Sequence, residues 1–348
     1  MDAWNELQHK NRTVFGATWS NDGTHLACGD NFGTISIWDM SGAAKKTVWS
    51  NAHKRICAGS PTSASIYCLE TLPDALGGHL VSGGMDGGVV LWRWPGESPE
   101  EVARLKKHPK ACETNGIATL TGHINAVVCA CGTYGRAEPG VAVIYDVESG
   151  KDIGTLQGHT KPFLCVTAAQ STSQAGECVI TGSEDGSIKL WDPRTLECTR
   201  TFAPQGAKWI SCVEVDAAGT QVVCGGGGAC EISCCLLPSL IPMAAAPLPA
   251  PLQTARYADD GTLFCGYGNT VARYSAELGP VSTRSIAGIQ TVYDIALSKQ
   301  RLDSTDTAAL LLAQLSSSFL ASKVAIVGEG SCVEVIENDA CDAVRLDF

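Results

Sequence analysis

The stretch Cys178–Asp192, which reads CVITGSEDGSIKLWD, decides the fold of this chain of 348 residues. It is a strand that ends in a small residue and Gly, a turn that contains a second Gly, and a strand that ends in Trp. The same pattern appears in His25–Met40 (HLACGDNFGTISIWDM) and in His79–Trp94 (HLVSGGMDGGVVLWRW). A strand-turn-strand unit that repeats along a chain predicts a repeat architecture, in which each unit buries its apolar face against the next.

The spacing of the repeats identifies the architecture. The units end at Trp38, Trp92 and Trp191, and Tyr145 in VAVIYDV takes the same place between the last two. Successive positions lie roughly 50 residues apart, somewhat longer than the ~40–45 residues of a WD-type propeller blade. We attribute the excess to loops such as the one near Leu76-Gly77-Gly78.

Two units also carry a polar series that is typical of WD repeats. In that family a His upstream of the Trp bonds to an Asp in the tight turn, and the series continues through a Ser or Thr to the indole. The matching residues are His53, Ser82, Asp86 and Trp92 in one unit, and His159, Thr181, Asp185 and Trp191 in another. A buried indole, hydroxyl and imidazole each need a partner, so we interpret these residues as a structural network and not as catalytic acid–base pairs.

The sequence therefore predicts an all-β protein, a single seven-bladed WD-repeat β-propeller at residues 12–348 that follows an N-terminal extension, 1–11. The prediction of the last three blades rests only on the regular recurrence of expected strands. The C-terminal AVRLDF is expected to form the outer strand of the last blade, so that side-chain packing closes the ring. The expected blades are 12–50, 51–106, 107–157, 158–203, 204–246, 247–287 and 288–348, with an insertion at 300–322.

Three positions depart from the repeat. Gly122-His123 resembles a repeat start but lies too close to Tyr145, so we interpret it as a turn within the third blade, with His108 as the histidine that precedes that blade. The first blade is degenerate, because Phe32 stands where the turn Asp is expected. Within the insertion, 308–315 (AALLLAQL) is expected to form a short helix, with disorder as the alternative.

Composition argues against several classes of function. A net charge of −11 disfavours binding to phosphate backbones, so we expect no direct binding of nucleic acid. The 17 cysteines include no Cys-x-x-Cys pair and fit reduced core thiols, so we expect neither a metal nor another cofactor. Gly225–Gly228 lacks the Lys-Ser/Thr of a phosphate loop, and no nucleophile elbow occurs. No segment suggests a signal peptide or a membrane span. We expect a binding platform and not an enzyme.

Some stretches resemble one family of WD-repeat proteins more closely, the family of subunit 6 of the THO complex. In that family a Trp-Ile followed by a small residue and Cys, and then a Val-Cys-Gly-Gly-Gly run, mark the fifth blade. Here Trp209–Cys212 and Val223–Gly227 match these two motifs. Similar stretches are Thr13–Met40, Gly158–Gln170, Cys178–Thr195 and Gly328–Phe348. The resemblance implies a nuclear scaffold in mRNA processing and export (TREX), with other THO subunits as partners, especially the coiled-coil subunits 5 and 7.

Two alternatives remain beside this role. Trp191-Asp192-Pro193-Arg194 matches the Trp-Asp-x-Arg box of WD proteins that recruit substrates to cullin–RING ubiquitin ligases, which would make a ligase adaptor the partner of Arg194. The other alternative is a generic WD scaffold. On the face that holds the loops between blades, Lys54, Arg55, Lys161 and Lys208 are candidate docking sites for acidic helices, or else solvated loop cations.

Overall fold

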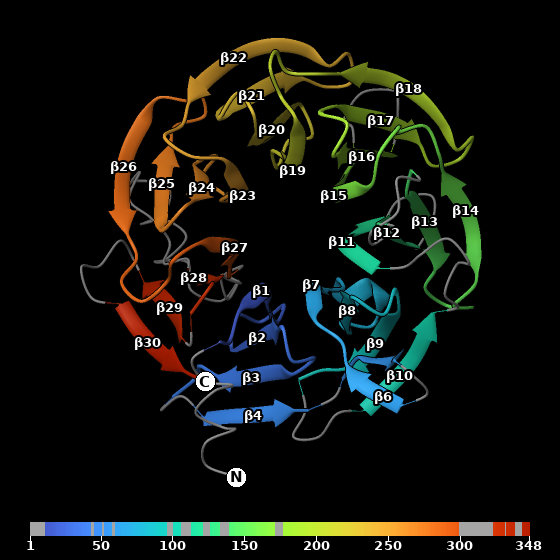
Figure 1. The fold of residues 1–348 in the computed structure, drawn as a ribbon, viewed down its shortest axis with the longest axis vertical. Coiled ribbons are helices and arrows are strands. Elements are labelled where there is room, and N and C mark those ends of the chain that lie inside the picture. The colour runs from blue at the N-terminus through green and yellow to red at the C-terminus, as the bar shows by residue number, and fades with distance from the viewer. Residues whose placement is uncertain are drawn as a thin grey trace, which may run out of the picture.

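The computed structural model is a ring of seven four-stranded antiparallel sheets around a central axis, which confirms the predicted all-β propeller (Figure 1). It describes residues 11–42, 45–50, 52–57, 60–95, 100–105, 113–120, 126–132, 139–170, 177–298, 323–330, 332–337 and 343–348. In each blade the chain runs outward as a meander, so that the first strand lies beside the axis and the fourth forms the rim.

The first four blades contain the recurring Trp or Tyr. Blade 1 consists of β1 (Val14–Trp19), β2 (His25–Asp30), β3 (Ile35–Asp39) and β4 (Lys45–Trp49). Blade 2 consists of β7 (Ile66–Thr71), β8 (Leu80–Gly84), β9 (Val89–Arg93) and β10 (Glu100–Leu105). Blade 3 consists of β11 (Glu113–Leu120), β12 (Ala126–Gly132), β13 (Val141–Asp146) and β14 (Asp152–Leu156). Blade 4 consists of β15 (Phe163–Gln170), β16 (Glu177–Ser183), β17 (Ile188–Asp192) and β18 (Glu197–Phe202).

The last three blades have the same topology without the polar series. Blade 5 consists of β19 (Trp209–Val215), β20 (Gln221–Gly227), β21 (Glu231–Leu236) and β22 (Ile241–Pro247). Blade 6 consists of β23 (Leu252–Tyr257), β24 (Leu263–Tyr267), β25 (Thr270–Tyr274) and β26 (Pro280–Ser285). Blade 7 consists of β27 (Val292–Leu297), β28 (Lys323–Gly328), β29 (Cys332–Glu337) and β30 (Ala343–Asp347).

Two smaller elements lie beside blade 2. A hairpin of β5 (Lys54–Cys57) and β6 (Ser60–Ser63) precedes its first strand, and a 3-10 turn, η1 (Asp74–Leu76), separates β7 from β8. His108, His123 and the expected helix at 308–315 lie outside the described residues. Among the residues that are described, no helix is long and apolar enough to cross a membrane.

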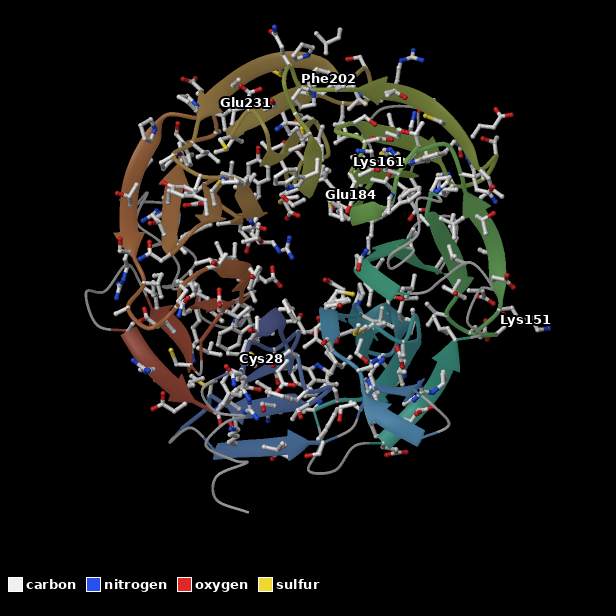
Figure 2. All side chains as sticks on the ribbon, viewed as in Figure 1. Cys28, Lys151, Lys161, Glu184, Phe202 and Glu231 are labelled. Atoms are coloured by element: carbon white, nitrogen blue, oxygen red, sulfur yellow. The ribbon has the colours of Figure 1, made fainter. Side chains whose placement is uncertain are left out.

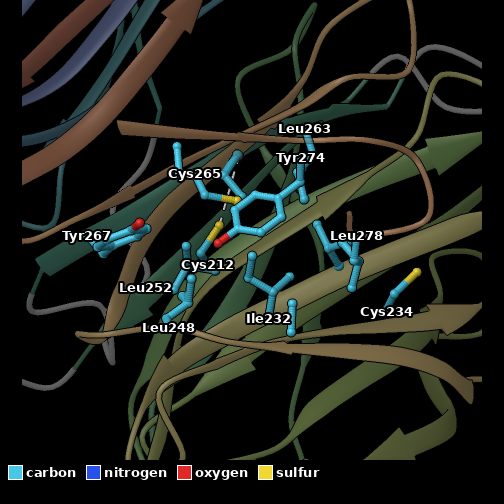
Figure 3. Packing of buried hydrophobic residues seen from close by; sticks show 14 residues of the cluster. Cys212, Ile232, Cys234, Leu248, Leu252, Leu263, Cys265, Tyr267, Tyr274 and Leu278 are labelled. Atoms are coloured by element: carbon cyan, nitrogen blue, oxygen red, sulfur yellow. Dashed lines mark hydrogen bonds between the residues drawn. The ribbon is translucent and has the colours of Figure 1, made fainter. Parts of the chain in front are cut away.

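The core lies between neighbouring sheets, where apolar side chains of adjacent blades interdigitate (Figure 2). The cluster between blades 5 and 6 is one example: Cys212 and Ile232 from blade 5 pack against Leu252, Leu263 and Cys265 from blade 6 (Figure 3). Each blade buries its apolar faces only against its neighbours, so the ring is stable only when it is closed.

Most of the described cysteines belong to these clusters. They are all free thiols, and Cys198 on β18 is the exposed one among them. Burial raises the pKa of Cys212 and Cys235 to about 12, and that of Cys178 to about 11. These thiols are therefore protonated at neutral pH and act as small apolar core residues.

The ring closes where blade 7 meets blade 1. The strand at the C-terminus, β30, forms the rim of blade 7, and all four strands of blade 1 come from the N-terminal part of the chain. The indole N–H of Trp19 donates to the carbonyl of Ala296 at 3.1 Å, and Phe348 packs edge-on against Trp38 with ring centroids 5.0 Å apart. Side-chain contacts and a backbone bridge between Thr13 and Glu329 hold this seam, and no described strand is exchanged across it.

Candidate protein-interaction site

The first polar network lies at the inner half of blade 2. His53 is fully buried, and its Nδ1 lies 2.8 Å from the Asp86 carboxylate while its Nε2 lies 2.8 Å from the Ser82 hydroxyl. The Trp92 indole N–H donates to the same hydroxyl at 2.7 Å. Because an indole only donates and a carboxylate only accepts, the hydroxyl donates to Nε2 and the Nδ1–H donates to Asp86. Each polar atom of the His53, Ser82 and Trp92 side chains therefore has a partner within the series.

The second network repeats this geometry in blade 4. His159 Nδ1 lies 2.8 Å from Asp185 and Nε2 lies 2.9 Å from the Thr181 hydroxyl, to which the Trp191 indole donates at 2.8 Å. Ser187 adds a hydroxyl and a backbone N–H to the other Asp185 oxygen, at 2.6 and 3.0 Å. The structure thus brings together the four residues that the sequence analysis grouped, as it does in blade 2.

The electrostatics of blade 4 agree with a neutral histidine. Burial lowers the pKa of His159, and the hydrogen bond to Asp185 offsets only part of that shift. Burial would raise the pKa of Asp185, but hydrogen bonds from Ser187 and Thr160 and the proximity of His159 lower it overall. A neutral imidazole beside an ionised carboxylate is a stable structural pair, and all its polar atoms are occupied within the blade.

Blade 1 uses a different carboxylate for the same turn. Asp30, two positions before Phe32, accepts the backbone N–H groups of Phe32 and Thr34, each at 2.9 Å, and forms an ion pair with Arg12 at 3.3 Å. Burial raises the pKa of Asp30 despite these partners. From the sequence the turn Asp of blade 1 was expected to be missing, and Asp30 supplies the carboxylate from two positions earlier. The signal was a buried Gly-Asp at the end of the strand.

The two faces of the ring follow from the strand order. One end of the strands carries the loops between blades and the turn between the second and third strands. Around blade 4 these segments are 157–162, 184–187 and 203–208. We call this side the connection face. Lys161 and Lys208 are exposed there. The turn of blade 4 holds the two loops together, since Gly186 lies against Ala207 and the Glu184 backbone N–H donates to Pro162 at 3.0 Å.

The other two cations predicted on the connection face lie in β5. Lys54 and Arg55 pair through their backbones with Ser63 and Thr62 of β6, in the hairpin that leads into blade 2. They therefore belong to a strand of that hairpin and not to an irregular loop. Their side chains lie outside the described part of the structure.

Arg194 lies on the opposite face, in the turn between β17 and β18. Its Nε and Nη2 donate to the two carboxylate oxygens of Asp192 at 3.1 and 3.0 Å, and its backbone N–H donates to Asp192 at 2.9 Å. This hydrogen bonding is the main reason that the pKa of Asp192 is lowered. Arg194 is half exposed and separated from the lysines of the connection face by the length of the blade.

A charged group that the sequence analysis missed lines the axis. Arg256 of β23 contacts Asp294 of β27 at 3.0 Å and Glu214 of β19 at 3.5 Å, and so links three consecutive inner strands. Burial would lower the pKa of Arg256, but the two carboxylates raise it overall. Arg256 and Glu214 border a polar cavity of about 370 Å³ at the end of the channel away from the connection face. A Glu and an Arg at matching places of two inner strands, Glu214 and Arg256, were the available signal.

An exposed tryptophan on the connection face was also missed as a site residue. Trp209, the first residue of β19, is 36% exposed and stands next to Lys208. The sequence singled it out only as part of the family motif Trp209–Cys212. Among the described side chains, no group of three or more His, Cys, Asp or Glu is arranged to hold a metal ion.

Comparison with known proteins supports the repeat type and gives specific relatives. The family model described as "WD domain, G-beta repeat" matches residues 5–39 and 150–192. Human THO complex subunit 6 is 26% identical over 291 residues, which cover 78% of this chain and 79% of that protein. The zebrafish (Danio rerio) THO complex subunit 6 homolog is 28% identical over 284 residues, covering 77% and 81%. Among solved structures, the RRP9 WD40 repeats superpose with a TM-score of 0.68 at 14% identity, covering 91% of this chain and 87% of that chain.

Proposed function

We propose that this chain is a non-enzymatic scaffold, the propeller subunit of a THO complex that acts in nuclear mRNA processing and export. The similarity to THO complex subunit 6 from several vertebrates, over more than three quarters of the chain, carries the proposal. Both ring nitrogens of His53 and His159, the two histidines most suggestive of chemistry, are hydrogen-bonded inside their blades, which fits a scaffold better than an acid–base catalyst.

We further propose that its partners are other THO subunits, foremost the coiled-coil subunits 5 and 7. A closed ring presents loops and rim strands in many directions, which suits a protein that holds several others together. Its net charge of −11 leaves contacts with RNA to more basic partners. This agrees with a role as an adaptor inside a nuclear RNA-processing assembly.

Affinity purification of the tagged full-length chain from its own cells tests this function. We expect the coiled-coil THO subunits among the proteins enriched at least ten-fold over an untagged control, and nuclear localisation of the tagged chain. Enrichment of unrelated complexes without any THO subunit would contradict the proposal. An unrelated tagged WD propeller is the matched control for nonspecific recovery.

A second candidate function is recruitment to a cullin–RING ligase through Arg194. Its half-exposed guanidinium stands at the surface opposite the connection face, accessible to an adaptor. However, the bidentate pair with Asp192 already occupies two of its donors. Recovery of a cullin adaptor with the wild-type chain and its loss with Arg194→Ala would favour this candidate. Equal recovery, or none from either chain, would exclude the box as a receptor.

A further inference from the structure

Trp209 occupies a position on the connection face that small or short side chains fill in other blades. The residue that precedes the buried start of the inner strand is Thr13 in blade 1, Ser65 in blade 2 and Pro162 in blade 4. In blade 5 it is Trp209, which is 36% exposed. Its indole N–H has no hydrogen-bond partner among the described residues. An aromatic side chain with a free donor is typical of a contact with another molecule.

The glycine run of β20 explains how the indole is held in place. Trp209 pairs with Gly227 across the sheet, and the indole rests on that residue, where a methyl group would overlap the ring. A methyl group at Gly226 would instead strike the Trp209 carbonyl. Gly227 therefore supports the indole, and Gly226 allows the close approach of the Trp209 backbone. The motif that marks the fifth blade thus builds a flat aromatic platform.

Two lysines flank this platform. Lys208 precedes Trp209, and its backbone N–H donates to Gly227 at 2.8 Å while its stem lies over Gly228. Lys161 comes from the adjoining loop of blade 4, and Figure 2 shows it over the inner half of that blade with Glu184 nearby. Neither lysine has an ion-pair partner among the described side chains. Arg93, Arg104 and most other described arginines are paired.

We propose that Trp209, Lys161 and Lys208 form a docking platform for a partner-protein segment in which carboxylates flank an apolar side chain. The indole supplies a flat apolar surface and one donor, and the lysines bind the carboxylates on either side. Most of the ring is acidic and repels such a segment, so two unpaired cations direct it to this part of the connection face. Glu184 opposes a second carboxylate beside Lys161 and so limits where the segment's charges can lie.

This inference deepens the proposed function, because an acidic, apolar-striped coiled coil is one kind of partner that meets these requirements. As a partner site of the THO complex the platform rests on the proposed function, whereas binding of an acidic segment can be tested whichever complex the chain joins. The test compares the tagged full-length chain with two variants, Trp209→Ala and the double variant Lys161→Glu/Lys208→Glu. The control is Lys151→Glu, which reverses an exposed lysine in the β13–β14 turn on the opposite face. Each chain is purified from cells, and its co-purifying proteins are quantified.

The same wild-type complexes are treated with a water-soluble carbodiimide, a zero-length reagent that joins amines to carboxylates in contact. We expect cross-links from Lys161 or Lys208 to Asp or Glu residues that flank an apolar residue in one partner. That partner should fall at least ten-fold with Trp209→Ala and with the double variant, and stay unchanged with Lys151→Glu. Unchanged thermal midpoints of all variants exclude misfolding as the cause.

Failure of the platform and failure of the proposed function give different results. THO subunits recovered equally by wild type and both variants, without cross-links at the two lysines, would overturn the platform and leave the function standing. Cross-links to an acidic segment of an unrelated protein that both variants lose would uphold the platform and contradict the THO role. Cross-links confined to Glu184 and other residues of this chain count against the platform.

Discussion

Asp294 in β27 accepts a hydrogen bond from the backbone N–H of Ala17 in β1 at 3.2 Å, across 277 residues of sequence. The same carboxylate accepts from the Thr254 hydroxyl at 3.2 Å and pairs with Arg256 at 3.0 Å. One side chain of blade 7 therefore bonds to the neighbouring blade on each side. No described strand is exchanged between blades 1 and 7, so this carboxylate and the backbone bridge between Thr13 and Glu329 are polar contacts that join the two blades.

Asp294→Ala should destabilise the protein by ~2–4 kcal/mol. The substitution leaves the Arg256 guanidinium with Glu214 alone and removes the acceptor of the Ala17 N–H. We place the value below the full cost of breaking a buried pair because about a third of the Arg256 side chain faces the channel. Urea unfolding followed by circular dichroism measures the change in the free energy of unfolding.

The matched control for the seam is Asp347→Ala, which breaks the exposed ion pair with Arg345 in the same blade. Its unfolding midpoint should stay close to that of the wild type, because exposed pairs contribute little. Equal midpoints for Asp294→Ala and Asp347→Ala would mean that Asp294 does not hold the ring closed.

The histidine networks give a second stability prediction. Asp185→Ala removes the acceptor of the His159 Nδ1–H inside a buried site and should cost about 1–3 kcal/mol. Asp86→Ala should cost a similar amount, because the distances around His53 are nearly the same. Thermal unfolding by calorimetry compares them. An unmoved midpoint in either variant would contradict the structural role assigned to that network.

The repeats allowed the fold and these two networks to be predicted, because the His, Asp, hydroxyl and Trp recur at similar spacing in both blades. The tie between Asp294 and Ala17 could not be predicted the same way. The two residues lie far apart in the sequence, and their contact exists only once all seven blades have closed into a ring. Asp30 was missed for a related reason: it stabilises its turn from two positions before the place that the motif defines.

Trp209, Lys161 and Lys208 could be predicted only in part from the sequence. The sequence singled out the Trp-Ile and glycine motifs as a family resemblance, but their physical connection needed the strand register. Only the pairing of Trp209 with Gly227 shows that one motif supports the other. Lys161 and Lys208 were predicted on one face. That their two loops lie together depends on the turn at Gly186, which packs against the loop that leads into blade 5.

Stability should fall as the solution becomes mildly acidic, partly because of His159. Burial lowers its folded-state pKa below the ordinary value of 6.5, so the unfolded chain binds more protons between those two pKa values. The contribution of His159 is therefore fully present above pH 6.5. It is lost at up to ~1.4 kcal/mol per pH unit as the pH falls from 6.5 toward the folded-state pKa.

Urea unfolding at half-unit steps from pH 7.5 to pH 5 measures this dependence. His159→Gln, which cannot titrate, should show a shallower slope than the wild type below pH 6.5. His79, whose pKa is also lowered by burial, is half exposed, and His79→Gln should change the slope less. Parallel curves for the wild type and His159→Gln would show that the imidazole has no shifted pKa.

Two adjacent glycines of β20 should respond differently to the same added methyl group. Gly226→Ala places the methyl group against the backbone carbonyl of Trp209, which cannot move without breaking the pairing of β19 with β20. We expect a loss of about 3 kcal/mol or more, at the upper end for overpacked sites. Gly227→Ala meets only the indole, which can rotate toward solvent, so the loss should be about 1 kcal/mol.

Acrylamide quenching of Trp fluorescence should increase for Gly227→Ala relative to the wild type. Because Gly227→Ala displaces the indole and keeps both lysines, it should also lose the acidic partner of the platform. Equal stability losses in the two variants would mean that Trp209 is not held on the glycine strand as the structure places it.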